Sequence, residues 1–321
     1  MIIKDEQNYE KIKKILEASI LSDPIKNILI NKYGISLKIF IREDIKKLED
    51  NQTKIFTKNN YLGMITISKK PWESSIFKKN IASIDSINIT NYDESLLDDL
   101  INYVVDWAKE NDIYLISYRT ENINNQLKKI KKLHFSMLKK KFYFIETYIT
   151  FINNLNNIDM DTENNNIRLL KDLSNIDEIK SIAKKSFKLD RFHIDPFLDD
   201  DLADKTREEW IKNIAKGRGK IFCSFDKNNN INGFLGFKDN IINNELKYST
   251  IELIAVHQDH QGKGIGKNLI NNYLQYLKNN KYKFSVVGTQ AKNIPSIKLY
   301  ERTGYEIIDS NYTYHWCIKN E

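Results

Sequence analysis

The chain has 321 residues, which corresponds to roughly two domains of about 150 residues each. Hydrophobic residues make up 41% and charged residues 29%, a composition typical of a folded globular protein and not of a disordered or fibrous one. The net charge is +7, but the lysine clusters lie beside apolar patterns typical of a solvated helix face, and no nucleic-acid motif accompanies them. We therefore expect no nucleic-acid partner, and the positive field favours small polyanionic ligands.

The sequence also limits where the protein acts. No apolar run approaches the roughly 18 residues of a membrane span, and the N-terminal segment lacks the apolar core and cleavage site of a signal peptide. Cys223 and Cys317 are far apart and belong to no Cys-x-x-Cys pattern, so we expect two buried strand cysteines in a reducing compartment. These features predict a cytoplasmic protein without membrane association.

The N-terminal half resembles the C-terminal half in the order of its predicted elements. Residues 1–50 are predicted to be helical, with a break at Asp23-Pro24. Residues 100–149 then read as helix, strand, helix and two strands, and residues 269–318 repeat that order. Repeats of this size indicate a duplicated domain and not a solenoid.

The two copies differ at the positions that carry distinctive residues. Thr120 falls opposite Thr289 and, after one deletion, Phe135 falls opposite Tyr305. In this alignment Ile130 stands opposite Tyr300 and His134 opposite Gly304, and no glycine loop precedes the first helix of the N-terminal copy. We infer that the N-terminal half kept the architecture and lost the chemistry.

A polar segment separates the halves. Residues 153–166 are rich in asparagine, short of apolar residues and without periodicity, which is typical of a linker. The predicted domains are therefore residues 1–152, including the helical extension 1–50, and residues 167–321.

A glycine-rich loop lies between a predicted strand and a predicted helix of the second domain. Thr250–Val256 is β-branched and apolar, as in a buried strand. The loop Gln261-Gly262-Lys263-Gly264-Ile265-Gly266-Lys267 follows, and the apolar residues behind it recur at helical spacing. Because a helix N-terminus offers free amide groups, and glycine lets a phosphate approach them, this loop suits a pyrophosphate.

Two common nucleotide loops do not fit this segment. A P-loop requires glycine where Gln261 stands and serine or threonine where Asn268 stands. In a dinucleotide-binding loop the third glycine would come one residue later than Gly266. An ordinary glycine-rich turn is the remaining alternative.

A second motif lies one helix and one strand downstream. Lys281–Thr289 is predicted to be a strand, and the segment Asn293–Tyr305 follows it. Asn293 suits a helix N-cap and Pro295 the first helical turn, while Gly304 suits the position that ends the helix.

Together these segments resemble the GNAT acetyltransferase superfamily. The loop fits Q/R-x-x-G-x-G/A, and Asn293–Tyr305 fits N-x-x-[A/S]-x-x-[L/F]-Y-x-x-x-G-[F/Y]. The resemblance implies an α/β (α+β) GNAT fold, a mixed central sheet flanked by helices, with a degenerate GNAT-like N-terminal domain. It also implies acetyl-coenzyme A as co-substrate. The cofactor-binding residues would be Ile254, Ala255, Val256, Gln261, Gly262, Lys263, Gly264, Ile265, Gly266, Lys267, Asn293, Ser296 and Tyr300.

The resemblance also implies roles in catalysis. Tyr300 would protonate the departing thiolate, and a backbone N–H near Ala255 and Val256 would stabilise the oxyanion. An amine must lose a proton to attack a thioester, and Glu252 is a candidate base, with a strand-end salt bridge as the alternative. No covalent intermediate is needed. His257 and His260 lack a third ligand nearby, so we expect no metal site.

Shorter motifs resemble the dTDP-4-amino-4,6-dideoxygalactose (dTDP-fucosamine) acetyltransferases, a GNAT subgroup of surface-polysaccharide synthesis. They are Pro71–Phe77, Asp190–His193, Glu209–Asn213 and Thr289-Gln290. The resemblance implies a nucleotide-linked amino sugar as acceptor, with Arg191, Phe192 and Gln290 binding it. Alternatively, Phe192 belongs to the core, Arg191 caps its helix, and Trp210 packs a helix.

The sequence is also compatible with other functions. A GNAT enzyme could act on another primary amine, in a small metabolite, an antibiotic or a peptide. The domain could also be a non-catalytic acyl-coenzyme A-binding module. A homodimer is possible.

Overall fold

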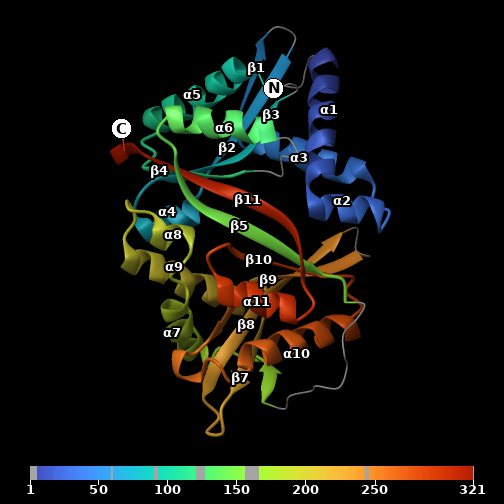
Figure 1. Cartoon of the computed structure of the whole chain (residues 1–321), viewed down its shortest axis with the longest axis vertical. Coiled ribbons are helices and arrows are strands. Elements are labelled where there is room, and N and C mark those ends of the chain that lie inside the picture. Colours follow the sequence, from blue (N-terminus) through green and yellow to red (C-terminus); the bar gives the residue numbers. More distant parts are fainter. Residues whose placement is uncertain are drawn as a thin grey trace. The chain divides into compact units, whose positions relative to one another are not determined.

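The computed structural model describes residues 6–58, 61–89, 93–120, 127–155, 166–242 and 246–320, and the chain forms two compact units (Figure 1). Unit 1 contains residues 1–146 and 311–321, and unit 2 contains residues 147–310. The predicted domains were 1–152 and 167–321, whereas the units divide inside two strands, β5 (Tyr143–Asn153) and β11 (Glu306–Cys317). Each of these strands begins in one unit and ends in the other.

Unit 1 begins with three helices that cover residues 6–50. Asp23 interrupts them because its carboxylate accepts hydrogen bonds from the amides of Ile25 and Lys26, and Pro24 then starts the next helix. The elements in chain order are α1 (Glu6–Ser22), α2 (Pro24–Asn31), α3 (Leu37–Asp50), β1 (Gln52–Lys58), β2 (Tyr61–Lys69), α4 (Pro71–Phe77), β3 (Ile81–Ile89), α5 (Glu94–Glu110), β4 (Leu115–Arg119) and α6 (Leu127–Lys139).

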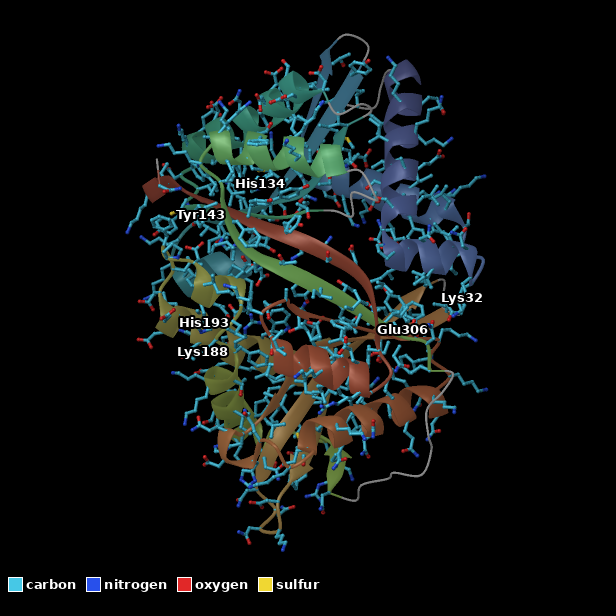
Figure 2. All side chains as sticks on the ribbon, in the orientation of Figure 1. Lys32, His134, Tyr143, Lys188, His193 and Glu306 are labelled. Atoms are coloured by element: carbon cyan, nitrogen blue, oxygen red, sulfur yellow. The ribbon has the colours of Figure 1, made fainter. Side chains whose placement is uncertain are left out.

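The sheet of unit 1 has the order β1-β2-β3-β4-β11. Strands β3 and β4 are parallel, and the other neighbours are antiparallel. Helix α5 buries Leu97, Leu100 and Val104 in a core that also contains Tyr118 and Trp316. The labelled side chains His134 and Tyr143 in Figure 2 belong to this unit.

Within unit 2 the strand order is β6-β7-β8-β9-β10-β5. Helices α10 and α11 supply the core on one face, and α7 and α9 supply the core on the other. The elements are β6 (Ile167–Leu169), α7 (Ile176–Ser186), α8 (Arg191–Ile194), α9 (Asp200–Asn213), a π-helical turn (Ile214–Arg218), β7 (Lys220–Phe225), β8 (Ile231–Ile242), β9 (Leu246–Val256), a 3-10 turn (Gln258–His260), α10 (Ile265–Asn279), β10 (Ser285–Gln290) and α11 (Ile294–Arg302).

The last strand in each of these two orders comes from the other half of the chain. In unit 2, β10 pairs with β5, which follows the helices of the N-terminal half. In unit 1, β4 pairs with β11, the final strand of the chain. Two strands were predicted at the end of each half, and this prediction was wrong: no glycine or proline interrupts residues 143–153 or 306–317, so each segment forms one long strand.

The fold class and the positions of the two cysteines agree with the sequence-based predictions. The mixed sheet flanked by helices confirms the predicted fold class. Cys223 lies in β7 and Cys317 in β11, and both are buried free cysteines, as predicted. Most of the predicted linker, residues 156–165, lies outside the described residues. In the described parts of the chain, no helix is both long enough and apolar enough to cross a bilayer.

Candidate functional site

The two central strands of unit 2 separate partway along their length. Strand β10 pairs with β9 only at Ser285–Ser249, Val286–Thr250 and Val287–Ile251. Beyond these pairs β9 continues to Val256 and β10 to Gln290. The backbone of each strand beyond the last pair is therefore available to a ligand placed between them.

A bulge in β9 lies where the separation begins. The register with β8 passes from Phe237–Ile251 to Gly236–Leu253, so Glu252 is an extra residue without a partner in that ladder. A bulge bends its strand and re-aims the side chains that follow. The bulge in β9 coincides with the point where the pairing of β9 with β10 ends.

The glycine loop follows directly at the end of β9. Gly262 and Gly264 have φ of +75° and +78°, a left-handed backbone that favours glycine, and nothing lies within 4 Å of where a Cβ would stand on either residue. The side-chain amide of Gln261 donates to the carbonyl of Val256 (3.1 Å), which ties the loop to the strand. Gly264 immediately precedes α10, and the loop is exposed, so an anion can reach the first amides of this helix.

Gly266 serves packing instead of ligand approach. A Cβ on this residue would meet Leu299 of α11 at 3.3 Å. Ile265 and Val256 pack against the same core as Leu299. The third glycine therefore lets α10 and α11 approach each other closely. Lys263 donates to the carbonyl of Asp259 (2.9 Å), and Lys267 is exposed.

Helix α11 begins and ends as its sequence predicts. The carboxamide of Asn293 accepts from the amide of Ser296 (3.3 Å) and donates to the hydroxyl of Thr289 (3.1 Å), which fixes the helix to the end of β10. Pro295 lies in the first turn, and Gly304, with φ of +79°, follows the last turn.

Tyr300 projects from α11 into the core of unit 2. Its side chain is only 3% exposed, and its ring lies 5.5 Å from that of Phe151 and 5.8 Å from that of Tyr305, measured between centroids. Burial, and secondarily the nearby Tyr148, raises the pKa of the Tyr300 phenol well above its ordinary value. Tyr300 is therefore a protonated donor at neutral pH.

Glu252 is held by cationic and polar partners. Its carboxylate accepts a hydrogen bond from the indole N–H of Trp210 (2.8 Å) and forms ion pairs with Lys238 (3.0 Å) and Arg218 (3.7 Å). The side chain is 6% exposed. These contacts favour the salt-bridge alternative, because the oxygens that would accept a proton already face two cations and a donor.

The predicted acceptor-binding pair lies on α8. Phe192 is 2% exposed, and the guanidinium of Arg191 lies 4.4 Å above its ring. The carboxylate of Asp190 caps α8 by accepting from the amides of Phe192 (2.8 Å) and His193 (3.3 Å). The burial of Phe192 favours the core alternative for this residue and leaves Arg191 as the half-exposed member of the pair.

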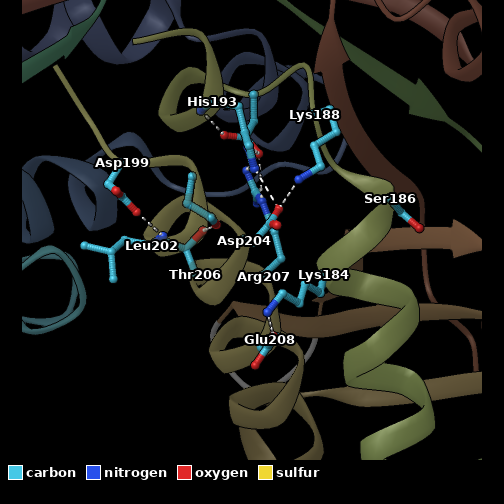
Figure 3. A network of polar contacts seen from close by, with 12 residues as sticks. Lys184, Ser186, Lys188, His193, Asp199, Leu202, Asp204, Thr206, Arg207 and Glu208 are labelled. Carbon is cyan, nitrogen blue, oxygen red and sulfur yellow. Dashed lines mark hydrogen bonds and ion pairs between the residues drawn. The ribbon is translucent and has the colours of Figure 1, made fainter. Parts of the chain in front are cut away.

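A buried charge cluster joins α8 to α9. The His193 ring contacts Asp190 (3.0 Å) through Nδ1 and Asp204 (2.9 Å) through Nε2, and Lys188 and His193 both point toward Asp204 (Figure 3). Arg207 donates to Asp190 through Nε (3.0 Å) and Nη2 (2.8 Å). Burial would raise the pKa of Asp190, but the hydrogen bond from His193 and the charge of Arg207 outweigh it and lower that pKa to about 2.

The same cluster favours the protonated form of His193. Burial alone would lower its pKa, but hydrogen bonds to the two carboxylates raise it. A protonated imidazole that bridges two carboxylates is a structural clamp and a poor proton acceptor. The cluster therefore positions the turn that carries Arg191.

Sequence reasoning missed one residue near the strand separation. Gln290, at the end of β10, stands opposite Tyr148 on β5. The ring of Tyr148 lies over Gly288, where an added Cβ would be 2.2 Å from the phenol oxygen. The only signal in the sequence is the glycine within the strand, and it does not identify the strand that covers it.

His257 caps the 3-10 turn, and His260 ends it. The ring centroids of His257 and His260 are 5.7 Å apart. Among the residues that the structure describes, no group of three or more His, Cys, Asp or Glu side chains is arranged to hold a metal ion.

Known proteins are similar to part of this chain in sequence. Residues 177–305 match the model of the acetyltransferase (GNAT) family. The spore coat polysaccharide biosynthesis protein SpsD of Bacillus subtilis (strain 168) is 31% identical over 140 residues, which are 43% of this chain and 46% of that protein. The match thus spans about half the length of this relative.

Two solved structures resemble the whole chain in fold. A tandem GNAT protein from the clavulanic acid biosynthesis pathway has a TM-score of 0.59 at 11% identity, covering 99% of this chain and 97% of that one. A GCN5-related N-acetyltransferase from Sphaerobacter thermophilus has a TM-score of 0.56 at 10% identity, covering 94% and 93%. At these identities the likeness concerns the fold alone. The chain is thus similar to the acetyltransferase (GNAT) family over residues 177–305, and it is similar in fold to a tandem GNAT protein.

Proposed function

We propose that the protein is an acetyl-coenzyme A-dependent N-acetyltransferase that transfers the acetyl group directly to an amine. The observation that carries this proposal is the separation of β9 from β10, with the glycine loop at its end and the buried phenol of Tyr300 in the same unit. The family match of residues 177–305 supports it independently.

The residues of β9 and the loop would hold the co-substrate. Free amides around Gly262 and Gly264 suit the pyrophosphate, and the exposed Lys263 and Lys267 add positive charge. Ile254–Val256 would hydrogen-bond the pantetheine arm through their backbone. Asn293 and Ser296 lie at the start of α11, and we propose that they complete the site.

Direct transfer requires two proton transfers: the amine must lose a proton, and the departing sulfur must gain one. The neutral amine attacks the thioester carbonyl, a C–N bond forms, and the C–S bond breaks to release a thiolate. Tyr300 gives its proton to that sulfur. No cysteine intermediate is required: burial raises the pKa of the Cys223 thiol to about 12, so that group is not a nucleophile at neutral pH.

The contacts of Glu252 bear on the choice of base. Two cations and an indole N–H hold its carboxylate. We propose that Glu252 fixes the bulge in β9, and that the amine loses its proton to water. An unchanged pH dependence of turnover in Glu252→Gln would agree with this assignment, and disappearance of the fall in turnover at low pH would contradict it.

For the acceptor we propose a nucleotide-linked amino sugar of the dTDP-4-amino-4,6-dideoxyhexose type. The name of the relative SpsD refers to polysaccharide biosynthesis. Arg191 offers a cation suited to a phosphate, and Gln290 lies at the end of β10. The burial of Phe192 favours a second candidate, another primary amine that does not need this aromatic contact.

The test measures thiol release from acetyl-coenzyme A with a panel of amines. The panel contains dTDP-4-amino-4,6-dideoxyhexoses, hexosamines, an aminoglycoside and a peptide with a free N-terminus. We expect saturable thiol release with the nucleotide sugars and formation of the acetylated sugar by mass spectrometry. Turnover of another amine alone would reject the acceptor assignment, and no turnover of any amine would reject the enzyme assignment.

A further inference from the structure

Strand β10 has a glycine where it first leaves β9. Gly288 directly follows Val287, the last residue of β10 that pairs with β9. A Cβ built on Gly288 would lie 2.2 Å from Oη of Tyr148 and 2.4 Å from both Cε1 and Cζ. These distances are far below van der Waals contact, so any other residue would expel the ring. The phenol of Tyr148 therefore lies at the start of the strand separation.

The register places Tyr148 and Tyr300 on opposite faces of the sheet. Strand β5 pairs with β10 without irregularity from Tyr148 to Asn153, so side chains alternate between the faces. Phe151 packs against Tyr300, and Tyr148, three residues earlier, points to the other face. That face carries Glu252 and its partner Trp210 of α9.

The two phenols are nevertheless close enough to influence each other. Tyr148 is the neighbouring ionisable group that contributes, after burial, to the raised pKa of Tyr300. Tyr148 is half-buried, whereas Tyr300 is almost fully buried. A thioester between β9 and β10 would thus have one phenol on each side.

We propose that Tyr148 is a catalytic residue on the acceptor side, whose phenol oxygen accepts a hydrogen bond from the attacking amine. This inference rests on the proposed acetyltransferase function. The hydrogen bond would aim the nitrogen lone pair at the acetyl carbon. It strengthens as positive charge develops on nitrogen during attack, so it stabilises the transition state more than bound substrate. The proton itself leaves to water.

The strand that carries Tyr148 comes from the N-terminal half of the chain. Residues 147–153 belong to unit 2 by their contacts, although they follow the helices and strands of unit 1 in sequence. The N-terminal half thus supplies a residue of the acceptor side in addition to its own fold.

The first test is removal of the hydroxyl alone. In Tyr148→Phe we expect kcat/KM for the amine to fall by about 10- to 100-fold, the usual effect of losing one hydrogen bond to a group that becomes charged. The KM for acetyl-coenzyme A and the Kd for coenzyme A should not change. Tyr143→Phe is the matched control, because it makes the same change on the same strand where Tyr143 packs against His315.

The second test is a double-mutant cycle on the contact with Gly288. Gly288→Ala should reduce amine turnover at least as much as Tyr148→Phe, because the new methyl group displaces the ring. In a Tyr148→Ala background the same Gly288→Ala change should have little further effect, because no ring remains to displace. Thermal unfolding of each variant confirms that the chain is folded.

Three results would overturn the role of Tyr148. The first is wild-type amine kinetics in Tyr148→Phe, and the second is an equal loss from Gly288→Ala in both backgrounds. The third is a loss of coenzyme A affinity in Tyr148→Phe equal to its loss of amine turnover. Failure of the proposed function looks different, since the wild-type protein would then release no thiol with any amine of the panel.

Discussion

The two units build a strand-helix-strand segment in the same way but fill the start of the helix differently. In unit 1, β3 leads to α5 and pairs in parallel with β4, as β9 leads to α10 and pairs with β10 in unit 2. The carboxylate of Asp93 caps α5 by accepting from the amide of Leu96 (2.9 Å). Helix α10 begins instead after Gly264, which has no side chain. One helix N-terminus carries its own anion, and the other is open to an external one.

Helix α6 of unit 1 and helix α11 of unit 2 also end in the same way but carry different side chains. The amide of Phe142 donates to the carbonyl of Met137 (3.1 Å) after α6, as the amide of Tyr305 donates to Tyr300 (3.0 Å) after α11. Lys141 and Gly304 precede these amides with φ of +61° and +79°. Buried Met137 therefore occupies in unit 1 the position that Tyr300 occupies in unit 2.

This equivalence corrects the sequence alignment of the two halves. Ile130 was aligned with Tyr300 and His134 with Gly304, and both assignments are wrong. Helix length causes part of this shift, since α6 has 13 residues and α11 has 9. The inference that unit 1 lacks the phenol still follows, because methionine has no proton to donate. A shared scaffold thus does not imply shared chemistry.

The largest expected effect is on kcat, and it should follow a change at Tyr300 but not a change at Met137. Tyr300→Phe should lower kcat by about 10²- to 10⁴-fold, because the thiolate then leaves without a proton donor. Met137→Leu, a change of similar volume at the equivalent position of unit 1, should leave kcat unchanged. Steady-state thiol release measures both, and equal losses in the two variants would contradict the contrast between the units.

The contacts that helices make are a second difference between the units. Helix α1 of unit 1 buries Ile12, Leu16 and Ile20, whereas α8 and α9 of unit 2 meet around buried Asp190. The pKa of Asp190 is lowered from 3.8 to about 2, so its contribution to stability is present above its ordinary pKa and is lost as pH falls toward 2. That contribution is about 2 kcal/mol, since one pKa unit corresponds to about 1.4 kcal/mol.

The measurement compares urea unfolding of the wild-type protein and Asp190→Asn between pH 6 and pH 2. The difference in the free energy of unfolding should shrink as pH falls. Asp201→Asn, at an exposed carboxylate of α9, is the control and should show no such trend. A difference that stays constant with pH would sink the assignment of charge to Asp190.

Transfer of the acidic cap from unit 1 to unit 2 tests the open helix end. Gly264→Asp should raise the KM for acetyl-coenzyme A by about tenfold, or about 1.4 kcal/mol, because a carboxylate then competes with the phosphate. Gly264→Asn is the matched control, because asparagine tolerates a positive φ equally well but is neutral. The loop would be excluded as the phosphate site if both variants bound acetyl-coenzyme A like the wild type.

The smallest expected effect follows removal of the acidic cap from α5 of unit 1, and it concerns the free energy of unfolding. Asp93→Ala should lower the free energy of unfolding by about 1 kcal/mol, the usual effect of removing a helix cap. It should not change the KM for acetyl-coenzyme A, because α5 is not part of the proposed site. Urea unfolding and steady-state kinetics measure the two quantities, and a change in KM would argue against the division of roles.

Local patterns in the sequence were sufficient for the parts of the site formed by one segment. The glycine loop needs two positive φ angles and a helix behind it, and both needs are visible in residues 261–277. The cap at Asn293 and the turn at Gly304 also depend on neighbouring residues alone. These features could therefore be predicted without knowledge of the tertiary structure.

Features formed by distant segments could not be predicted. The pairing of β5 with β10 joins residues that are more than a hundred positions apart, and no local pattern encodes it. Tyr148 was missed for that reason. The burial of Phe192 depends on the charge cluster that holds α8 against α9, and Glu252 meets cations from two other elements. Long-range contacts decided which polar residues were available for chemistry.

The most direct measurement is a crystal structure of the complex with coenzyme A. We predict the pyrophosphate at the amides of residues 262–266, the pantetheine between β9 and β10, and the sulfur beside the Tyr300 phenol. Coenzyme A bound at α5 of unit 1, or density that avoids the gap between β9 and β10, would contradict the proposed site.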